Sequence, residues 1–178
     1  PRRADVPYPQ LTGADQALCR GTSVAICASD LHLYRVRIPI QPGAVRAHDF
    51  GVIVEEVCAH VGRVKPGDRV VACFFTYCGN CFYCRRVWFA QCETQTVFGS
   101  GKHLRDLGGG QAEYCVAPNA DHTLELIPDG VSDEQALFVG DILATGFFGA
   151  ERAGVEPGDS VAVIGCGPVG LMAIMSAR

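Results

Sequence analysis

Residues 160–177 read SVAVIGCGPVGLMAIMSA, and they say more about the fold than any other stretch of the chain. An apolar run typical of a buried strand leads into glycines spaced G-x-G-x-x-G, and a second apolar run suited to a helix follows. The glycine spacing alone is weak, but strand, glycine loop and helix in this order are typical of a dinucleotide-binding unit. Such glycines let the backbone turn tightly and approach a pyrophosphate at the positive end of the helix. We therefore expect NAD or NADP to contact Gly165, Gly167, Pro168, Val169 and Gly170.

Upstream of this unit the sequence favours short strands. Segments 21–27 and 51–57 are rich in β-branched residues, and GQAEYCVAP at 110–118 has a strand pattern. Pro66–Gly67 and Pro157–Gly158 each predict a turn that leads into a strand. Residues 93–111 are rich in glycine and predict a long surface loop.

The domain organisation follows from this order of elements. Ser132 and Gln135 have the spacing of a capping box, which predicts an interrupted helical stretch from about residue 133 to Gly154. Many strands followed by the first strand, loop and helix of an α/β unit predict a mixed β and α/β fold. The expected domains are 1–154, β-rich, and 155–178, the start of a dinucleotide-binding domain.

Composition excludes several classes of protein. With 178 residues and 48% hydrophobic content, the chain can bury a core, so it is not a disordered protein. It has no uncharged apolar stretch of about 18 residues, which excludes a membrane span, and its 15 basic residues are scattered, which argues against nucleic acid. The start PRRADVPYPQ and the apolar end predict part of a longer protein.

The cysteines indicate a metal. Four of the ten lie within residues 78–92, CGNCFYCRRVWFAQC, which points to metal binding in a reducing compartment, and we expect the cytoplasm. Four thiolates in a short loop suit a closed, tetrahedral structural zinc site. An iron–sulfur cluster would favour a gap of about three residues and a Cys-Pro pair, whereas seven residues separate the last two cysteines here, and Glu93 follows them. The remaining alternative is four thiols without a metal. The expected zinc ligands are Cys78, Cys81, Cys84 and Cys92.

Six short motifs occur along the chain, and their order is typical of one protein family. They are ICASDLH at 26–32, HDF at 48–50, the four-cysteine lobe at 78–92, GGQAEY at 109–114, DILATG at 141–146 and GCGPVG at 165–170. From about residue 20 onward the chain thereby resembles the zinc-dependent medium-chain alcohol dehydrogenases. The resemblance implies a GroES-like catalytic domain with two zinc ions, a Rossmann domain for NAD or NADP, and oxidation of an alcohol to an aldehyde or ketone.

The DILATG motif also resembles a subgroup around glutathione-independent formaldehyde dehydrogenases. The family's formaldehyde enzymes carry a longer insertion after the fourth lobe cysteine, and the segment from Cys92 to Gly109 is short. We therefore favour a general alcohol dehydrogenase, with a formaldehyde-specific enzyme as the alternative.

The resemblance assigns roles to individual residues that their spacing alone would not single out. The catalytic zinc would be held by Cys27, His48 and Asp141, with Asp49 in place of the family's nearby glutamate. Asp49 is expected to face away from His48, because adjacent strand side chains point to opposite faces. Ser29 matches a hydroxyl relay, His32 its outer acceptor and Asp30 a carboxylate that orients His48. The plain alternatives are a turn for Ser29, a surface ion pair for Asp30 and simple exposure for His32.

The remaining expectations concern partners. A small alcohol or aldehyde is the expected substrate, its identity being unreadable, and the whole protein is expected to form a homo-oligomer.

The N-terminal part alone should be inactive, because its cofactor site is incomplete. The residue that selects NAD or NADP lies about 20 positions past the glycine loop, beyond Arg178. The competing functions are a non-catalytic zinc-binding module and an inactive relative. His60, His103 and His122 are expected at the surface.

Overall fold

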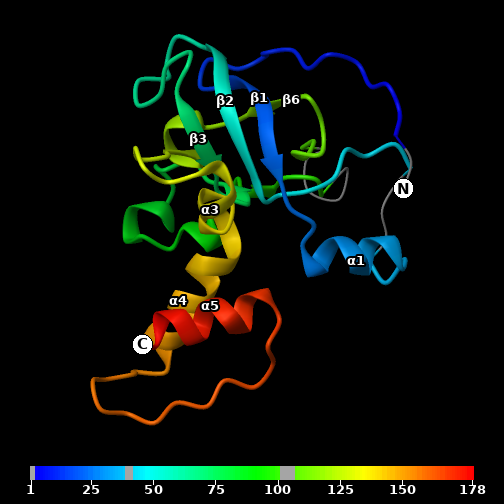
Figure 1. The fold of residues 1–178 in the computed structure, drawn as a ribbon. Helices are drawn as coiled ribbons and strands as arrows, with labels where there is room; N and C mark the ends of the chain where they lie inside the picture. The colour runs from blue at the N-terminus through cyan, green and yellow to red at the C-terminus, as the bar shows by residue number, and fades with distance from the viewer. Residues whose placement is uncertain (1–2, 39–41, 101–106) are drawn as a thin grey trace.

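The computed structural model describes residues 3–38, 42–100 and 107–178 (Figure 1). One antiparallel sheet of five strands, in the order β6-β1-β2-β3-β7, dominates this part of the chain. Its strands are β1 (Ala17–Val24), β2 (Phe50–Val57), β3 (Arg69–Ala72), β6 (Tyr114–Ala117) and β7 (Leu124–Leu126). Two further strands, β4 (Phe75–Thr76) and β5 (Thr96–Val97), pair with each other.

The helices are short. They are α1 (Ala28–Tyr34), α2 (Ala120–Thr123), α3 (Asp133–Ala136), α4 (Ala144–Arg152) and α5 (Pro168–Ser176). Two 3-10 turns, η1 (Cys84–Arg86) and η2 (Phe89–Gln91), lie in the cysteine lobe, and a π-helical turn, η4 (Val139–Leu143), precedes α4. Across residues 3–38, 42–100 and 107–178, no helix has the length and apolar character needed to cross a bilayer.

The core lies on one face of the five-stranded sheet. Phe50, Val52 and Val54 alternate along β2 and are almost fully buried, as the two-residue period of a strand requires. Phe98, after β5, meets Phe50 edge to face with ring centroids 4.9 Å apart. The prediction of a surface loop over 93–111 is therefore wrong for Phe98, because this ring completes the core. Residues 101–106, with His103, lie outside the described residues.

Several predicted strands are present with altered bounds. β1 ends at Val24 rather than at residue 27, because Cys27 already caps α1. The strand predicted after Pro66–Gly67 is divided into β3 and β4 around Cys73 and Phe74. The predicted capping box is confirmed: the Ser132 hydroxyl accepts from the Gln135 N–H at 3.3 Å, and α3 begins at Asp133.

The strand predicted over 160–164 is absent. A strand needs a neighbour for its backbone hydrogen bonds, and none of the described segments pairs with these residues. Ile164, expected in a buried strand, is 100% exposed.

The helix predicted after this segment does form, and Figure 1 shows α5 lying against α4 below the sheet. Gly146 of α4 permits this approach, because a Cβ there would overlap the α5 backbone at Ala173.

Residues 45–47 are held by close backbone packing against 109–111. The N–H groups of Gly109, Gly110 and Gln111 donate to the carbonyl oxygens of Val45, Ala47 and Arg46 at 3.0, 3.0 and 2.8 Å. A Cβ at Gly109 would overlap the carbonyl oxygens of both Arg46 and Ala47. Glycine is thus required where the segment that leads to His48 is held.

Gly109→Ala should therefore destabilise the protein by about 1–3 kcal/mol, because the opposing atoms are backbone and cannot rotate away. Gly108→Ala is the matched control, since no described atom lies within 4 Å of its added Cβ, and it should change stability by less than about 0.5 kcal/mol. Urea unfolding midpoints of the two variants measure the difference. Equal midpoints would contradict this packing.

Candidate metal centres

Cys27 lies where β1 gives way to α1. Its backbone is extended, with φ −79° and ψ 160°, and it is the residue that caps the helix. The Cys27 N–H donates to Asp30 Oδ2 at 3.0 Å, so the first turn of α1 fixes the position of this residue. The side chain is half-buried. The thiol is thus held at the end of the sheet by a local turn.

His48 and Asp49 immediately precede β2, and both are buried. Ala47 has φ 73°, an uncommon left-handed conformation for a residue with a side chain. The expectation that Asp49 faces away from His48 is wrong, because Asp49 Oδ2 lies 3.7 Å from His48 Nε2. The alternation of a regular strand begins only at Phe50. Both side chains therefore face one site.

Asp141 reaches the same site from η4. The Phe74 N–H donates to the carbonyl oxygen of Gly140 at 3.2 Å, and a Cβ at Gly140 would overlap the carbonyl oxygen of Ala72. These contacts hold η4 against the end of β3. Asp141 Oδ1 accepts a hydrogen bond from Thr145 Oγ1 at 2.9 Å, which leaves Oδ2 for the site. Sequence reasoning missed Thr145, although the DILATG motif contains it.

The four side chains form one compact donor cluster. Asp141 Oδ2 lies 3.5 Å from His48 Nε2 and 4.0 Å from Cys27 Sγ. With a carboxylate oxygen of Asp49, all four ligand atoms lie within 4.8 Å of one another. Zinc bonds of about 2.0–2.3 Å place tetrahedral ligand atoms roughly 3.3–3.8 Å apart. The 3.5 Å between Asp141 and His48 lies in this range, and the 4.0 Å between Asp141 and Cys27 is slightly wider. Asp49 Oδ1 is buried without a hydrogen-bond partner in the described part of the chain.

The charges of this cluster are strongly coupled. Burial opposes protonation of His48, but the hydrogen bond to Asp141 and the charges of Asp49 and Cys27 outweigh it and raise the pKa of His48 to about 9. Burial raises the pKa of Asp49 to about 6. The hydrogen bond from His48 lowers the pKa of Asp141. In the metal-free cluster a proton on His48 therefore takes the place that a cation would fill.

The other three predicted site residues, Ser29, Asp30 and His32, all lie in α1 and outside the donor cluster. Ser29 is half-buried, and its Oγ has no hydrogen-bond partner among the described residues. His32 is exposed in the last turn of α1. Asp30 Oδ2 accepts a hydrogen bond from the Cys27 N–H, and Asp30 Oδ1 lies 3.6 Å from Arg46 Nη2. The described contacts of Asp30 therefore go to the Cys27 segment and to Arg46, and its expected orientation of His48 finds no support in them.

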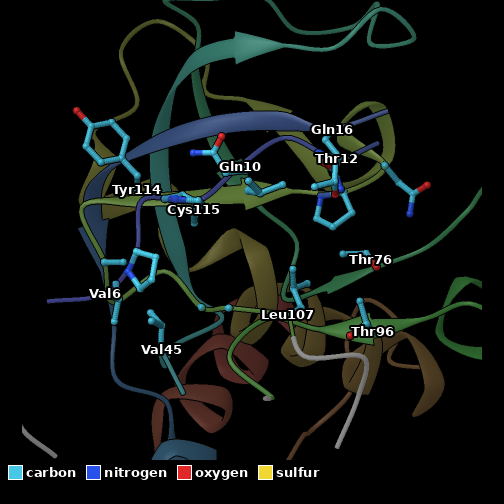
Figure 2. Close-up of a pocket in the computed structure, with 18 of the residues that line it drawn as sticks. Val6, Gln10, Thr12, Gln16, Val45, Thr76, Thr96, Leu107, Tyr114 and Cys115 are labelled. Carbon is cyan, nitrogen blue, oxygen red and sulfur yellow. Dashed lines mark hydrogen bonds between the residues drawn. The ribbon is translucent and has the colours of Figure 1, made fainter. Parts of the chain in front are cut away.

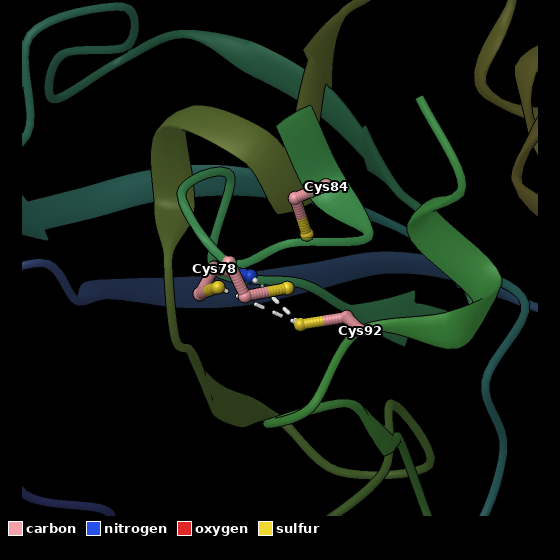
Figure 3. Close-up of side chains that lie close together, drawn as sticks. Cys78, Cys84 and Cys92 are labelled. Carbon is pink, nitrogen blue, oxygen red and sulfur yellow. Dashed lines mark hydrogen bonds between the residues drawn. The ribbon is translucent and has the colours of Figure 1, made fainter. Parts of the chain in front are cut away.

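The second cluster is the cysteine lobe, in which Figure 3 shows the sulfur atoms converging. Cys92 Sγ lies 3.6 Å from Cys78 Sγ, and the four cysteines offer ligand atoms within 4.8 Å of one another. Although burial opposes it, hydrogen bonds from Thr94 and from the Cys78 N–H lower the pKa of Cys92 to about 6. Thiolate is the form that binds zinc. The lobe therefore offers four sulfur donors, and its hydrogen bonds favour the thiolate form of Cys92.

Aromatic contacts link the lobe to α2. Tyr77 stacks on Phe89 with ring centroids 4.3 Å apart, and His122 lies against its ring at 5.3 Å. Gly79 has φ 73°, and a Cβ there would overlap the His122 ring. His122 is exposed, as expected, although its ring lies against that of Tyr77.

The glycine loop has the shape expected of a phosphate-binding turn. Gly165 has φ 106°, Gly167 caps α5 and Pro168 occupies its first turn. A Cβ at Gly170 would overlap the carbonyl oxygen of Gly165, so only glycine allows this approach. No described atom lies within 4 Å of a Cβ built at Gly165 or Gly167. Open space therefore lies before the N-terminus of α5, and Val169 is exposed.

A separate pocket of about 570 Å³ lies between the N-terminal residues 6–16 and the sheet (Figure 2). Thr76, Thr96, Tyr114 and Cys115 are among its lining residues. None of the candidate metal ligands lines this pocket. It is therefore distinct from both donor clusters.

Comparison with known proteins identifies the relatives of this chain. Residues 13–129 match the family described as the alcohol dehydrogenase GroES-like domain. The chain is 41% identical over 179 residues to an uncharacterized zinc-type alcohol dehydrogenase-like protein, AdhB, of Bacillus subtilis, covering 95% of this chain and 47% of that protein. It is 37% identical over 191 residues to formaldehyde dismutase of Pseudomonas putida, covering 97% and 47%.

The solved structures agree. Alcohol dehydrogenase TADH from Thermus sp. ATN1 has a TM-score of 0.95 and 45% identity, covering 98% of this chain and 50% of that chain. This likeness confirms the predicted fold class, in which a GroES-like part leads into the start of an α/β part. The chain spans about half the length of the relatives named here.

The cysteine lobe leads to a prediction about the zinc content of the protein. Cys84→Ser removes a buried sulfur donor, so zinc content should fall by one equivalent and stability should fall with it. Cys58→Ser, at a cysteine outside both clusters, is the control and should leave zinc content unchanged. Metal analysis and thermal unfolding provide the readouts. Unchanged zinc content and melting in Cys84→Ser would refute a zinc site in the lobe.

A further prediction concerns the protonation of His48 in the metal-free protein. NMR titration should place the midpoint of His48 near pH 9, because its acidic neighbours stabilise the charged ring. Zinc needs the neutral ring, so affinity for zinc at this cluster should fall as pH drops below that midpoint. Asp141→Asn should lower the midpoint, while Asp121→Asn, in α2 and hydrogen-bonded to the Gly62 N–H, should not. A midpoint near 6.5 that Asp141→Asn leaves unmoved would contradict the coupling.

Proposed function

The chain belongs to the zinc-dependent medium-chain alcohol dehydrogenase family, and from this premise we propose that it forms the zinc-binding catalytic part of an alcohol dehydrogenase. The whole protein would oxidise an alcohol to an aldehyde or ketone and pass a hydride to NAD or NADP. The observation that carries the proposal is the compact cluster of Cys27, His48, Asp49 and Asp141, four donors brought together from three separate parts of the chain.

We propose Cys27, His48 and Asp141 as the protein ligands of the catalytic zinc. Asp141 Oδ2 is the donor that lies close to both of the others. Thr145 donates to the other oxygen of Asp141 and so orients the carboxylate. One thiolate and one carboxylate balance the 2+ charge, and three protein ligands leave the fourth position open for substrate, as a catalytic site requires.

When bound, zinc would supply a Lewis acid that makes the hydroxyl proton of an alcohol easier to lose. The protein must then accept and move that proton. The Asp49 carboxylate belongs to the same cluster as the proposed ligands, so it is placed to accept a proton there. Ser29, whose buried hydroxyl has no described partner, is the proposed first member of a relay that leads to His32 at the surface.

Hydride transfer needs a cofactor, and the glycine loop is its proposed site. Gly165, Gly167 and Gly170, with Pro168 and Val169, border the N-terminus of α5, where backbone N–H groups attract a pyrophosphate. The absence of side chains at the glycines leaves room for the phosphates.

The lobe has a different proposed role. Cys78, Cys81, Cys84 and Cys92 would hold a structural zinc with no position left for substrate. The ion would fix a loop that contains only two short 3-10 turns. The lobe therefore supports the fold and takes no part in the chemistry.

A formaldehyde-converting enzyme is the second candidate, and the similarity to formaldehyde dismutase of Pseudomonas putida supports it. A small substrate would suit either reaction. A non-catalytic zinc module is less well supported, because it leaves the first cluster without a role. A homo-oligomer in the cytoplasm remains our proposal for the state of the whole protein.

Paired substitutions in the whole protein test the ligand assignment. Asp141→Asn should weaken zinc retention at the first cluster by about 10-fold or more, because it removes the carboxylate between Cys27 and His48. Asp49→Asn should keep two zinc ions per chain and mainly lower kcat. Zinc analysis after mild chelation and NAD(P)-linked alcohol oxidation are the measurements. Loss of zinc in Asp49→Asn with full retention in Asp141→Asn would reverse the assignment.

A further inference from the structure

We propose that Arg46 is a positioning residue that fixes the Cys27 segment and the His48 segment relative to one another. The inference rests on the proposed zinc site, because its purpose is to keep two ligands at the spacing that zinc requires. It concerns a residue outside the donor cluster.

The guanidinium of Arg46 joins two parts of the chain. Nη1 donates to the carbonyl oxygen of Gly99 at 2.6 Å, and Nη2 lies 3.6 Å from Asp30 Oδ1. The ion pair is largely shielded from water, with side chains 19% and 10% exposed for Arg46 and Asp30. Pairs in such surroundings are screened by salt much less than surface pairs.

Asp30 links Arg46 to the proposed ligand Cys27. Its Oδ2 accepts from the Cys27 N–H at 3.0 Å, so one carboxylate contacts both the Cys27 backbone and Arg46. Oδ1 is buried and has no hydrogen-bond partner in the described residues, which makes Arg46 its charge partner. Because Arg46 lies two positions before His48, Cys27 and His48 are joined through one partly buried ion pair.

The backbone of Arg46 is held independently of its side chain. Its carbonyl oxygen accepts from the Gln111 N–H at 2.8 Å, and Val45 and Ala47 accept from Gly109 and Gly110. Removal of the guanidinium should therefore leave residues 45–47 in place against the glycines. Asp30 would then lose its charge partner, and the first turn of α1 beside Cys27 would be free to shift.

Charge replacement tests the proposal in the zinc-loaded whole protein. Arg46→Met should weaken zinc retention at the first cluster by about 10-fold or more, with the lobe zinc unchanged. After exchange of the first-cluster zinc for Co²⁺, its visible absorption spectrum should change, because that spectrum reports ligand geometry. Arg46→Lys, which keeps the charge, should recover part of the retention. Arg20→Met removes an exposed partner of Glu55 and should change neither readout.

A double variant separates positioning from general damage. Asp30→Asn combined with Arg46→Met removes the unpaired carboxylate and keeps an acceptor for the Cys27 N–H, so retention should recover relative to Arg46→Met alone. Wild-type retention and spectrum in Arg46→Met would overturn the inference, and so would a double variant no better than the single one. A wild-type protein that binds zinc only in the lobe would instead refute the proposed function.

Discussion

The candidate site depends on the register of β1 against β2. Val24 lies opposite Phe50, and the Ala25 N–H continues the pairing by donating to the Asp49 carbonyl oxygen at 3.0 Å. The residues that leave β1 and those that enter β2 are therefore neighbours, and each segment carries a metal donor. A slip of one residue would turn Phe50, Val52 and Val54 out of the core, so burial of these side chains fixes the register. The core thus determines where Cys27 and His48 lie.

The two donor clusters are built in different ways. The lobe takes its four cysteines from one short loop, so local turns and one glycine bring the sulfur atoms together. The first cluster joins Cys27 to Asp141, 114 residues apart, and needs the sheet, the β3 end and η4 to be in place. A closed four-sulfur site suits support of the fold, whereas mixed sulfur, nitrogen and oxygen donors suit chemistry at an open position.

This difference explains what the sequence could predict. The lobe and the capping box at Ser132 were readable because their residues are close in the chain. Cys27, His48 and Asp141 were found only through the family resemblance, since no local pattern relates them. The orientation of Asp49 was predicted wrongly, because the left-handed backbone at Ala47 leaves no clear signal in the sequence. Arg46 and its pairing with Asp30 were not foreseen either, because the pair forms only once α1 and the β2 segment meet. The prediction of a strand over 160–164 was wrong because none of the described strands pairs with this segment.

The most direct test of the account is a crystal structure of the zinc-loaded protein, with anomalous diffraction recorded at the zinc absorption edge. The account predicts two zinc peaks, one among the four lobe sulfur atoms and one in contact with Cys27, His48 and Asp141. The second ion should keep one position free of protein ligands. A single peak confined to the lobe, with the first cluster free of metal, would contradict the catalytic zinc site on which the proposed function rests.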